Sequence, residues 1–245
     1  MSSQPVQQSD VAIHTNRRRV EDILNRLDCE WSPEPWTPDR KPVDTLVATI
    51  LSQNTSDVNT ERAFAALRER FPDWSEVASA DPEEVIDAIR PGGLAAQKGP
   101  RIQNVLIEIL SPGDEAPNDT LLERLDAMSE DEAMDWLTSF SGVGPKTAAC
   151  VLLFAVGKPV VPVDTHVYRV SRRIGLIGPK VDADRSHRVL VELVPPRDSY
   201  RFHVHLIHHG RTVCTARNPK CGRCILNDLC DYASAINGTD SQEPA

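Results

Sequence analysis

Apolar residues recur along the chain three and four positions apart, the spacing of one helix face, while strand-like alternation is scarce. The first such stretch predicts a helix from Thr15 or Asn16 to Leu27. A second predicted helix places on one face Val43, Leu46, Val47, Ile50 and Leu51. The only extended segment of note, GKPVVPV, is interrupted by prolines, which a central strand does not tolerate. The pattern predicts an all-α protein of roughly nine to eleven short helices.

Residues that begin helices support this interpretation. Ser56 or Asp57 is placed to cap one helix, and the segment DPEE at 81–84 is a strong start signal for another. The segment SEDE at 129–132 has the form of a capping box. Four of the nineteen prolines lie in WSPEPWTPDRKP, residues 31–42, which predicts an extended connector between helices.

Two glycines and a proline stand between two predicted helices in DWLTSFSGVGPKTAACVLLFAVG. Gly142 and Gly144 permit the backbone angles of a tight turn and leave its amides uncovered, and Pro145 suits the first position of a helix. Free N–H groups at a helix N-terminus bind anions such as a phosphate. The segment has the form of a helix-hairpin-helix, which holds a nucleic-acid backbone without reading its sequence. An ordinary corner between two helices would show the same glycines.

Lys146 occupies the first turn of the second of these helices, where the positive end of the helix dipole disfavours an ammonium. This position favours the neutral amine, which is the form that attacks carbon. A lysine that contacts phosphate, or one that is simply solvated, would also account for the position. Lys146 is therefore a candidate nucleophile.

Asp164 is the candidate partner of Lys146, because it follows a proline-bounded link and precedes another helical pattern. The helix after Lys146 is about ten residues long, or roughly 15 Å. The extended link over 157–163 can span roughly 23 Å, which is enough to lead the chain back to the start of that helix. The starts of the two helices can thus be neighbours, with an amine and a carboxylate at one site. An aspartate here is also a plain N-cap, and the two roles are compatible.

Four of the six cysteines stand close together in the spacing C-x6-C-x2-C-x5-C, namely Cys214, Cys221, Cys224 and Cys230. In a reducing cytoplasm such crowding predicts a metal site before it predicts disulfides. Four thiolates suit either a tetrahedral zinc or a [4Fe–4S] cluster, and ligand chemistry alone does not separate the two. Cys29 and Cys150 fall on apolar helical patterns and are expected to be buried thiols.

The formal net charge of −9 argues against binding to nucleic acid, because such proteins usually present a basic face. The cysteine segment nevertheless predicts a local basic surface. Arg217, Lys220 and Arg223 lie among the predicted ligands, so folding around a metal would bring these three positive charges together on one face. No stretch approaches about eighteen uninterrupted apolar residues, and the first residues lack the apolar core of a signal peptide. We therefore expect a cytoplasmic protein without a membrane span.

A dense group of histidines offers a second possible metal site. Its members are His203, His205, His208 and His209, and His205 with His209 has the i, i+4 spacing of a metal pair. No glutamate lies between them as in the hydrolytic metal motif. We expect no separate metal site at these residues.

The glycine turn with its lysine, the downstream VDTHVYRV and the cysteine spacing, in this order, closely resemble the endonuclease III family of base excision DNA glycosylases. The resemblance covers roughly residues 17 to 232. It implies an all-α, two-domain helix-hairpin-helix DNA glycosylase fold, and it favours a structural [4Fe–4S] cluster over zinc. The expected boundaries are 37–158 for a six-helix barrel with the hairpin at 134–156, 15–36 with 159–232 for a discontinuous iron–sulfur cluster domain, a disordered tail at 1–14 and a flexible tail at 233–245.

In that family, the lysine that matches Lys146 attacks C1′ of a damaged pyrimidine nucleotide and displaces the base, assisted by the aspartate that matches Asp164. The resulting Schiff base undergoes β-elimination, which nicks the strand, and the chemistry requires the nucleotide to be flipped out of the duplex. The resemblance implies that Gln53 fills the void and that Leu94 is the wedge. It implies a monomer that binds double-stranded DNA with a damaged pyrimidine or an abasic site. The DNA-binding candidates are Gln53, Leu94, Gly142, Gly144, Thr147, His166, Arg217, Lys220 and Arg223.

The sequence departs from the family in SQNTSD, which carries one residue more between Gln53 and Asp57 than the common pattern, so the lesion pocket is expected to differ. Two other functions stay open. One is a monofunctional mismatch glycosylase for adenine, or for thymine or uracil, without the lyase step, although adenine-specific members usually lack a lysine at the position of Lys146. The other is a DNA-binding or redox-sensing iron–sulfur module that has lost catalysis.

Overall fold

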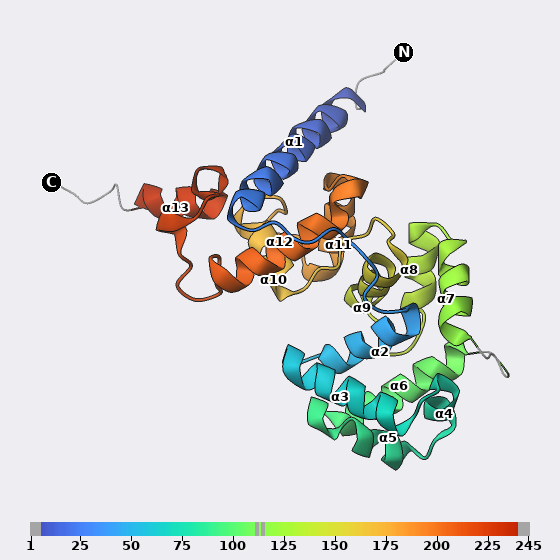
Figure 1. Ribbon diagram of the computed structural model, residues 1–245. Coiled ribbons are helices and arrows are strands. Elements are labelled where there is room, and N and C mark those ends of the chain that lie inside the picture. Colours follow the sequence, from blue (N-terminus) through green and yellow to red (C-terminus); the bar gives the residue numbers. More distant parts are fainter. Residues whose placement is uncertain (1–5, 111–112, 114–115, 240–245) are drawn as a thin grey trace. The chain divides into compact units, whose positions relative to one another are not determined.

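The structure is a computed structural model that describes the backbone of residues 6–110, 113 and 116–239. Every regular element in these ranges is a helix, which confirms the all-α prediction (Figure 1). The chain divides into a central unit, Thr37–Lys158, and a terminal unit formed by Met1–Trp36 and Pro159–Ala245. Within the described ranges, none of the helices combines the length and apolar composition that crossing a bilayer demands.

The central unit is arranged around a buried helix, α2. Nine of the eleven residues of α2 are buried, since it packs against α3, α7 and α9. The π-helical turn continues α9, so the second helix of the predicted hairpin is longer than α9 alone. The helical segments of this unit are α2 (Pro42–Ser52), α3 (Asp57–Arg70), α4 (Trp74–Ser79), α5 (Pro82–Ala88), a 3-10 turn (Arg90–Gly92), α6 (Ala95–Ile109), α7 (Pro117–Asp126), α8 (Glu130–Thr138), α9 (Pro145–Cys150) and the π-helical turn (Val151–Val156).

Hydrogen bonds confirm the three helix starts that the sequence predicted in this unit. The Ser56 hydroxyl accepts from a backbone amide at the start of α3, and the Asp81 carboxylate does the same at α5. Ser129 and Glu132 form the expected capping box at α8. Each contact satisfies an N–H group that a helix start leaves without an intrahelical partner. The short helix α4 was not predicted.

The terminal unit brings the first helix of the chain together with the last ones. Its core is formed by fully buried side chains that include Ile23, Leu24, Val167, Val170, Leu190, Phe202 and Leu206. The apolar face predicted for the first helix is thus one wall of this core. The helical segments are α1 (Val6–Glu30), α10 (Thr165–Arg173), α11 (Ala183–Leu193), three 3-10 turns (Pro196–Asp198, Cys221–Arg223 and Asn227–Leu229), α12 (Ser199–Thr212) and α13 (Asp231–Thr239).

The two predicted tails are wrong where the structure shows helix. Helix α1 begins at Val6, so positions 6–14 continue the first helix. No proline or glycine lies between Val6 and Glu30, so a helix anchored by its apolar face can extend backwards. At the other end α13 covers most of the predicted flexible tail, because Ala233 is buried in the core and anchors it. Positions 1–5 and 240–245 lie outside the described residues.

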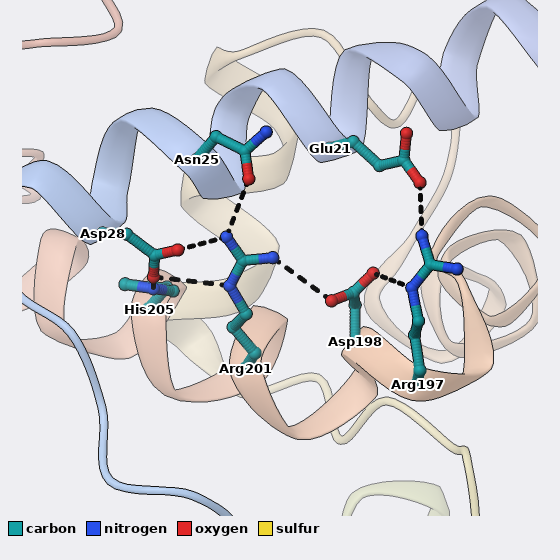
Figure 2. Close-up of polar contacts among 7 residues, drawn as sticks. All are labelled: Glu21, Asn25, Asp28, Arg197, Asp198, Arg201 and His205. Carbon is teal, nitrogen blue, oxygen red and sulfur yellow. Dashed lines mark hydrogen bonds and ion pairs between the residues drawn. The ribbon is translucent and has the colours of Figure 1, made fainter.

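A network of charged and polar side chains fastens α1 to α12 and to the 3-10 turn before it. Figure 2 shows its members, which are Glu21, Asn25, Asp28, Arg197, Asp198, Arg201 and His205. Asp28 pairs with Arg201 and accepts a hydrogen bond from Nε2 of His205 at 2.7 Å. Partial burial alone would raise the pKa of Asp28, but the hydrogen bonds from Arg201 and His205 hold it below its usual value. Burial lowers the pKa of His205, so this histidine contributes to the fold as a neutral ring.

Two arginines of α1 also reach the C-terminal loops. Arg19 donates to the carbonyl oxygen of Ile174 at 2.6 Å and to that of Leu229 at 2.8 Å. Arg26 donates to the carbonyl oxygen of Ile225 at 3.2 Å and pairs with Asp228. These contacts tie α1 to the segment between the last cysteines, which explains why the first helix folds with the C-terminal helices.

Two buried histidines hold the extended link that precedes α10. His187 bonds through Nδ1 to the carbonyl oxygen of Val161 at 3.0 Å, and His203 bonds through Nδ1 to that of Pro162 at 2.8 Å. Because a carbonyl only accepts, both rings carry their proton on Nδ1. Burial lowers the pKa of His187, so its ring stays neutral in the folded chain.

The neutral His187 ring makes stability depend on pH. Its ordinary value is 6.5, and its pKa is lowered in the folded state, so the unfolded chain takes up a proton first as the pH falls below 6.5. Stability is fully present above that pH and is lost below it. We expect wild type to lose about 1 kcal/mol more than His187→Asn between pH 7.5 and about pH 5.5, measured by urea unfolding. Asparagine keeps a donor for Val161 but does not titrate, so equal losses in the two proteins would contradict this assignment.

Candidate functional site

The predicted hairpin lies between the end of α8 and the start of α9, in the central unit. Gly142 has φ +91°, a conformation that side chains rarely adopt, and a Cβ there would lie 2.4 Å from Cδ of Arg101. Gly144 is the N-cap of α9, and a Cβ there would meet nothing within 4 Å. The first glycine is therefore required by the fold, whereas the second leaves open space in front of the helix start.

Lys146 lies in the first turn of α9 and is half-buried. Within the described chain, its ammonium has no ion-pair or hydrogen-bond partner. Its neighbour Thr147 is only 3% exposed, so this residue can offer an anion its backbone amide rather than its hydroxyl. The start of α9 thus presents an open glycine, backbone amides and one unpaired amine.

Helix α6 supplies an arginine that joins the hairpin to the end of α2. Arg101 packs against Gly142 and donates through Nη1 to Oε1 of Gln53 at 2.6 Å. Gln53, the predicted void-filling residue, is therefore half-buried and held by this contact at the C-cap of α2. Sequence reasoning did not identify Arg101, because its partners are distant along the chain.

Two exposed tips next to these elements have left-handed backbone conformations. Leu94, the predicted wedge, has φ +52° and is 46% exposed at the N-cap of α6. Asn54, which sequence reasoning missed, has φ +53° and is exposed in the turn between α2 and α3. Such conformations are uncommon for residues other than glycine and cluster at functional sites.

A buried lysine lies between the two tips. Lys98 of α6 is 2% exposed, and its ammonium donates to three oxygens: the Leu51 carbonyl at 2.6 Å, the Thr55 hydroxyl at 2.6 Å and the Gly92 carbonyl at 3.1 Å. Burial lowers the pKa of Lys98. Thr55 in turn donates to the Gly92 carbonyl at 2.6 Å, so the turn after α2 and the turn before α6 are bonded to each other.

Asp164 belongs to the terminal unit, where it is the N-cap of α10. Its Oδ1 accepts from the amides of His166 at 2.8 Å and Val167 at 2.7 Å, so the simple capping role is present. The predicted DNA-binding residue His166 is half-buried, and its Nδ1 accepts from Arg169 at 3.1 Å.

Two arginines of α10 hold the first cysteine. Arg169 donates to the carbonyl oxygens of Cys214 at 3.1 Å and of Gly210 at 2.9 Å. Arg173, one turn later, donates to Sγ of Cys214 at 3.4 Å and to the carbonyl oxygen of Thr215 at 2.7 Å. Their i, i+4 spacing in VYRVSRR was the only sequence signal of this role. The helix that Asp164 caps is therefore bonded to the cysteine loop.

The four predicted ligands line one cavity. Cys214, Cys221, Cys224 and Cys230 surround it together with Arg173, His209 and Tyr232. Among the described residues, no three His, Cys, Asp or Glu side chains are grouped so that they could hold a single metal ion. The residues fit a cluster, because all four cysteines line the same cavity and Arg173 donates to Sγ of Cys214, and hydrogen bonds to sulfur tune iron–sulfur clusters.

Burial perturbs the groups that surround this cavity. It raises the pKa of the Cys224 thiol to about 11 and lowers the pKa of His209 to about 4. The His209 ring is therefore neutral near pH 7. Its Nε2 lies 3.6 Å from Sγ of Cys224. The basic residues Arg217, Lys220 and Arg223 are exposed on the cysteine segment, and Lys220, which lines the cavity, donates to the carbonyl oxygen of Thr212 at 2.8 Å.

The remaining candidates have structural partners. His203 and His205 bond to Pro162 and Asp28, as described above, and His208 stacks on Trp31 with ring centroids 4.4 Å apart. Cys150 is buried, as predicted, but Cys29 is exposed. The prediction for Cys29 is wrong because the buried face of α1 follows Val20, Ile23, Leu24 and Leu27, and position 29 lies beyond that stripe.

Comparisons with known proteins agree with this geometry. Residues 47–196 match the HhH-GPD superfamily of base excision DNA repair proteins, and residues 214–230 match the iron–sulfur binding domain of endonuclease III. Endonuclease III of Synechocystis sp. is 38% identical over 196 residues, which is 79% of this chain and 83% of the relative. Endonuclease III of Escherichia coli K12 is 32% identical over 225 residues, covering 91% and 99%.

A solved structure shows the same fold. It is a trapped covalent intermediate of endonuclease III with DNA, with a TM-score of 0.73 and 26% identity, and the match covers 90% of this chain and 98% of that one. The iron–sulfur domain match assigns the four cysteines to a [4Fe–4S] cluster rather than to zinc. The chain therefore belongs to the HhH-GPD superfamily of base excision DNA repair proteins and, within it, to the endonuclease III family of iron–sulfur DNA glycosylases and abasic-site lyases.

Proposed function

We propose that this chain is a bifunctional DNA glycosylase and abasic-site lyase that removes oxidised pyrimidines from double-stranded DNA, acting as a cytoplasmic monomer. The observation that carries the proposal is Lys146, a half-buried amine at the start of the hairpin helix with no partner in the described chain. The other half-buried lysine of the central unit, Lys158, donates to the Met128 carbonyl at 2.6 Å, whereas Lys146 has no such acceptor among the described residues. The similar endonuclease III structure is a covalent complex with DNA, which supports a covalent step.

In this proposal the neutral amine of Lys146 attacks C1′ of the flipped nucleotide. The bond from C1′ to the base breaks, and the base leaves with the electron pair and takes up a proton. The sugar ring then opens as C1′–O4′ breaks and O4′ is protonated, which leaves a Schiff base on Nζ. Loss of a proton from C2′ expels the 3′ phosphate, and water finally releases the lysine.

Asp164 is the second group of the proposed site. Its Oδ1 is fixed by two backbone amides, so the carboxylate has one orientation and Oδ2 is the oxygen that can face a substrate. A carboxylate held in this way stabilises positive charge as it develops on the sugar and can move protons.

The DNA contacts in the proposal come from both units. The open N-terminus of α9, with Gly142, Gly144 and the Thr147 amide, receives a phosphate, while Leu94 enters the duplex and Gln53 lies beside the void. Arg217, Lys220, Arg223 and His166 meet the backbone from the terminal unit. These cations provide a local attraction for phosphate despite the net charge of −9.

Borohydride trapping tests the nucleophile. We expect wild type to form a covalent adduct with duplexes that carry thymine glycol or an abasic site, and Lys146→Ala to form none. Lys158→Ala is the matched control, because this lysine donates to the Met128 carbonyl and is placed in no catalytic role. Asp164→Asn keeps the N-cap and should react about 10²- to 10⁴-fold more slowly. Base release without any adduct would replace the proposal with a monofunctional glycosylase.

Truncation of the wedge tests how the duplex is opened. Leu94→Ala removes an exposed side chain but leaves the backbone angles in place, so the free energy of unfolding should change by less than about 0.5 kcal/mol. Excision from a lesion duplex should slow on the order of tenfold, because the flipped state loses its support. Ile107→Ala, which truncates another exposed residue of the same unit, should have no effect. Equal rates for the two variants would remove Leu94 from the DNA interface.

Removal of a ligand tests the cluster and its loop. Cys224→Ser should lose iron, sulfide and the visible absorbance, and its DNA affinity should fall with a shallower dependence on salt, since Arg217, Lys220 and Arg223 are no longer held together. Cys29→Ser, at an exposed cysteine outside the cavity, should keep all of these properties. Because the pKa of Cys224 is raised to about 11, loading of the metal-free protein must displace protons and should weaken as the pH falls. Stoichiometric zinc in a colourless wild-type protein would contradict the cluster.

A further inference from the structure

The buried Lys98 has no part in the proposed chemistry, yet it is the most unusual charge in the central unit. At 2% exposure it cannot reach DNA, and no carboxylate pairs with it in the described chain. An ammonium is rarely buried without an anion, and burial lowers the pKa of Lys98. A buried ammonium at this position therefore has to be explained by the groups that it bonds.

The three acceptors of Lys98 belong to two different turns. The Leu51 carbonyl lies in the last turn of α2, and the Thr55 hydroxyl lies in the turn that carries Asn54. The Gly92 carbonyl lies in the 3-10 turn that leads to Leu94. Three donors on one nitrogen match three oxygens, an arrangement for which lysine is suited and for which a planar arginine is not. The Thr55 hydroxyl completes the set by donating to the Gly92 carbonyl at 2.6 Å.

The packing around Gly92 keeps this arrangement fixed. A Cβ on Gly92 would lie 2.9 Å from Cβ of Ala63, so the 3-10 turn approaches α3 as closely as a glycine permits. Asn54 directly precedes Thr55, and Leu94 lies two positions after Gly92. Both Asn54 and Leu94 have left-handed backbone angles. Such angles persist only where the surrounding structure over-determines them.

We propose that Lys98 is a positioning residue for duplex DNA: its three hydrogen bonds fix the distance between the Asn54 turn and the Leu94 tip. This inference rests on the proposed function, in which Leu94 enters the duplex. The new element is that the Asn54 turn and the Leu94 tip act together at a fixed distance from each other. This distance matters only when a base must be extracted from a duplex. A single strand, whose nucleotides are already unstacked, does not depend on it.

The test compares Lys98→Met with Lys158→Met on two substrates. Each variant removes an ammonium that donates to helix-end carbonyls of the central unit, but Lys158 bonds to Asp126 and Met128, away from the tips. Under single-turnover conditions, Lys98→Met should excise thymine glycol from a duplex about tenfold to a hundredfold more slowly than Lys158→Met. On a single-stranded oligonucleotide with an abasic site, both variants should nick within about twofold of wild type.

Hydrogen exchange gives a readout that does not depend on activity. In Lys98→Met, the amides of 53–56 and 92–95 should exchange faster, while those of α8 and α9 keep the rates of wild type. If Lys98→Met does not fold, Thr55→Val serves instead, because it keeps the side-chain shape and removes only the hydroxyl that links the two turns. It should give the same selective loss on the duplex.

The outcomes separate the inference from the function on which it rests. Equal losses on duplex and single strand, or unchanged exchange at both tips, would overturn the positioning role of Lys98. A wild-type protein that nicks neither substrate would instead overturn the proposed lyase function, whatever the variants do.

Discussion

The fold depends on cationic side chains that donate to backbone carbonyls at the ends of helices. A chain made of many short helices has many C-terminal ends, and each end leaves carbonyl oxygens without an intrahelical partner. Arginines and lysines from distant segments supply the donors. Lys98 bonds to the end of α2, Lys158 to the end of α7, Arg19 to the end of α10 and Arg169 to the last turn of α12. These contacts fix the ends of helices whose apolar faces are already packed together, as α10 is against α12.

This use of cations also bears on the acidic composition. Several of the chain's 27 lysines and arginines are committed to carbonyls or to internal ion pairs, such as the network in Figure 2. The net charge of −9 is therefore a poor guide to the local field, since a cation bonded to carbonyls still adds its charge to the surface above it. The exposed cations of the cysteine loop are gathered on one short segment, and salt will screen their attraction for phosphate more than it weakens the buried bonds.

Local chemistry made part of this structure predictable. The caps at Ser56, Asp81 and Ser129 and the cysteine spacing are determined within a few residues, so the sequence shows them directly. Lys98 and Arg169 were not predictable, because their acceptors lie 47 and 45 residues away and are carbonyls, which no side-chain pattern reveals. The exposed Cys29 was misjudged, because the edge of a buried stripe depends on which helices cover it. The roles of the proposed site residues stay predictions.

Helix α10 shows how the same interaction connects the cysteine loop to Asp164. Asp164 caps its first turn through Oδ1, and Arg169 and Arg173 bond its later turns to the loop of Cys214. A helix of nine residues is too short to be stable alone, so its position is set by these end contacts and by its buried face against α12. The direction in which Asp164 presents its carboxylate is therefore fixed from the cysteine loop. The loop of Cys214 is in this way bonded to the same short helix that carries Asp164.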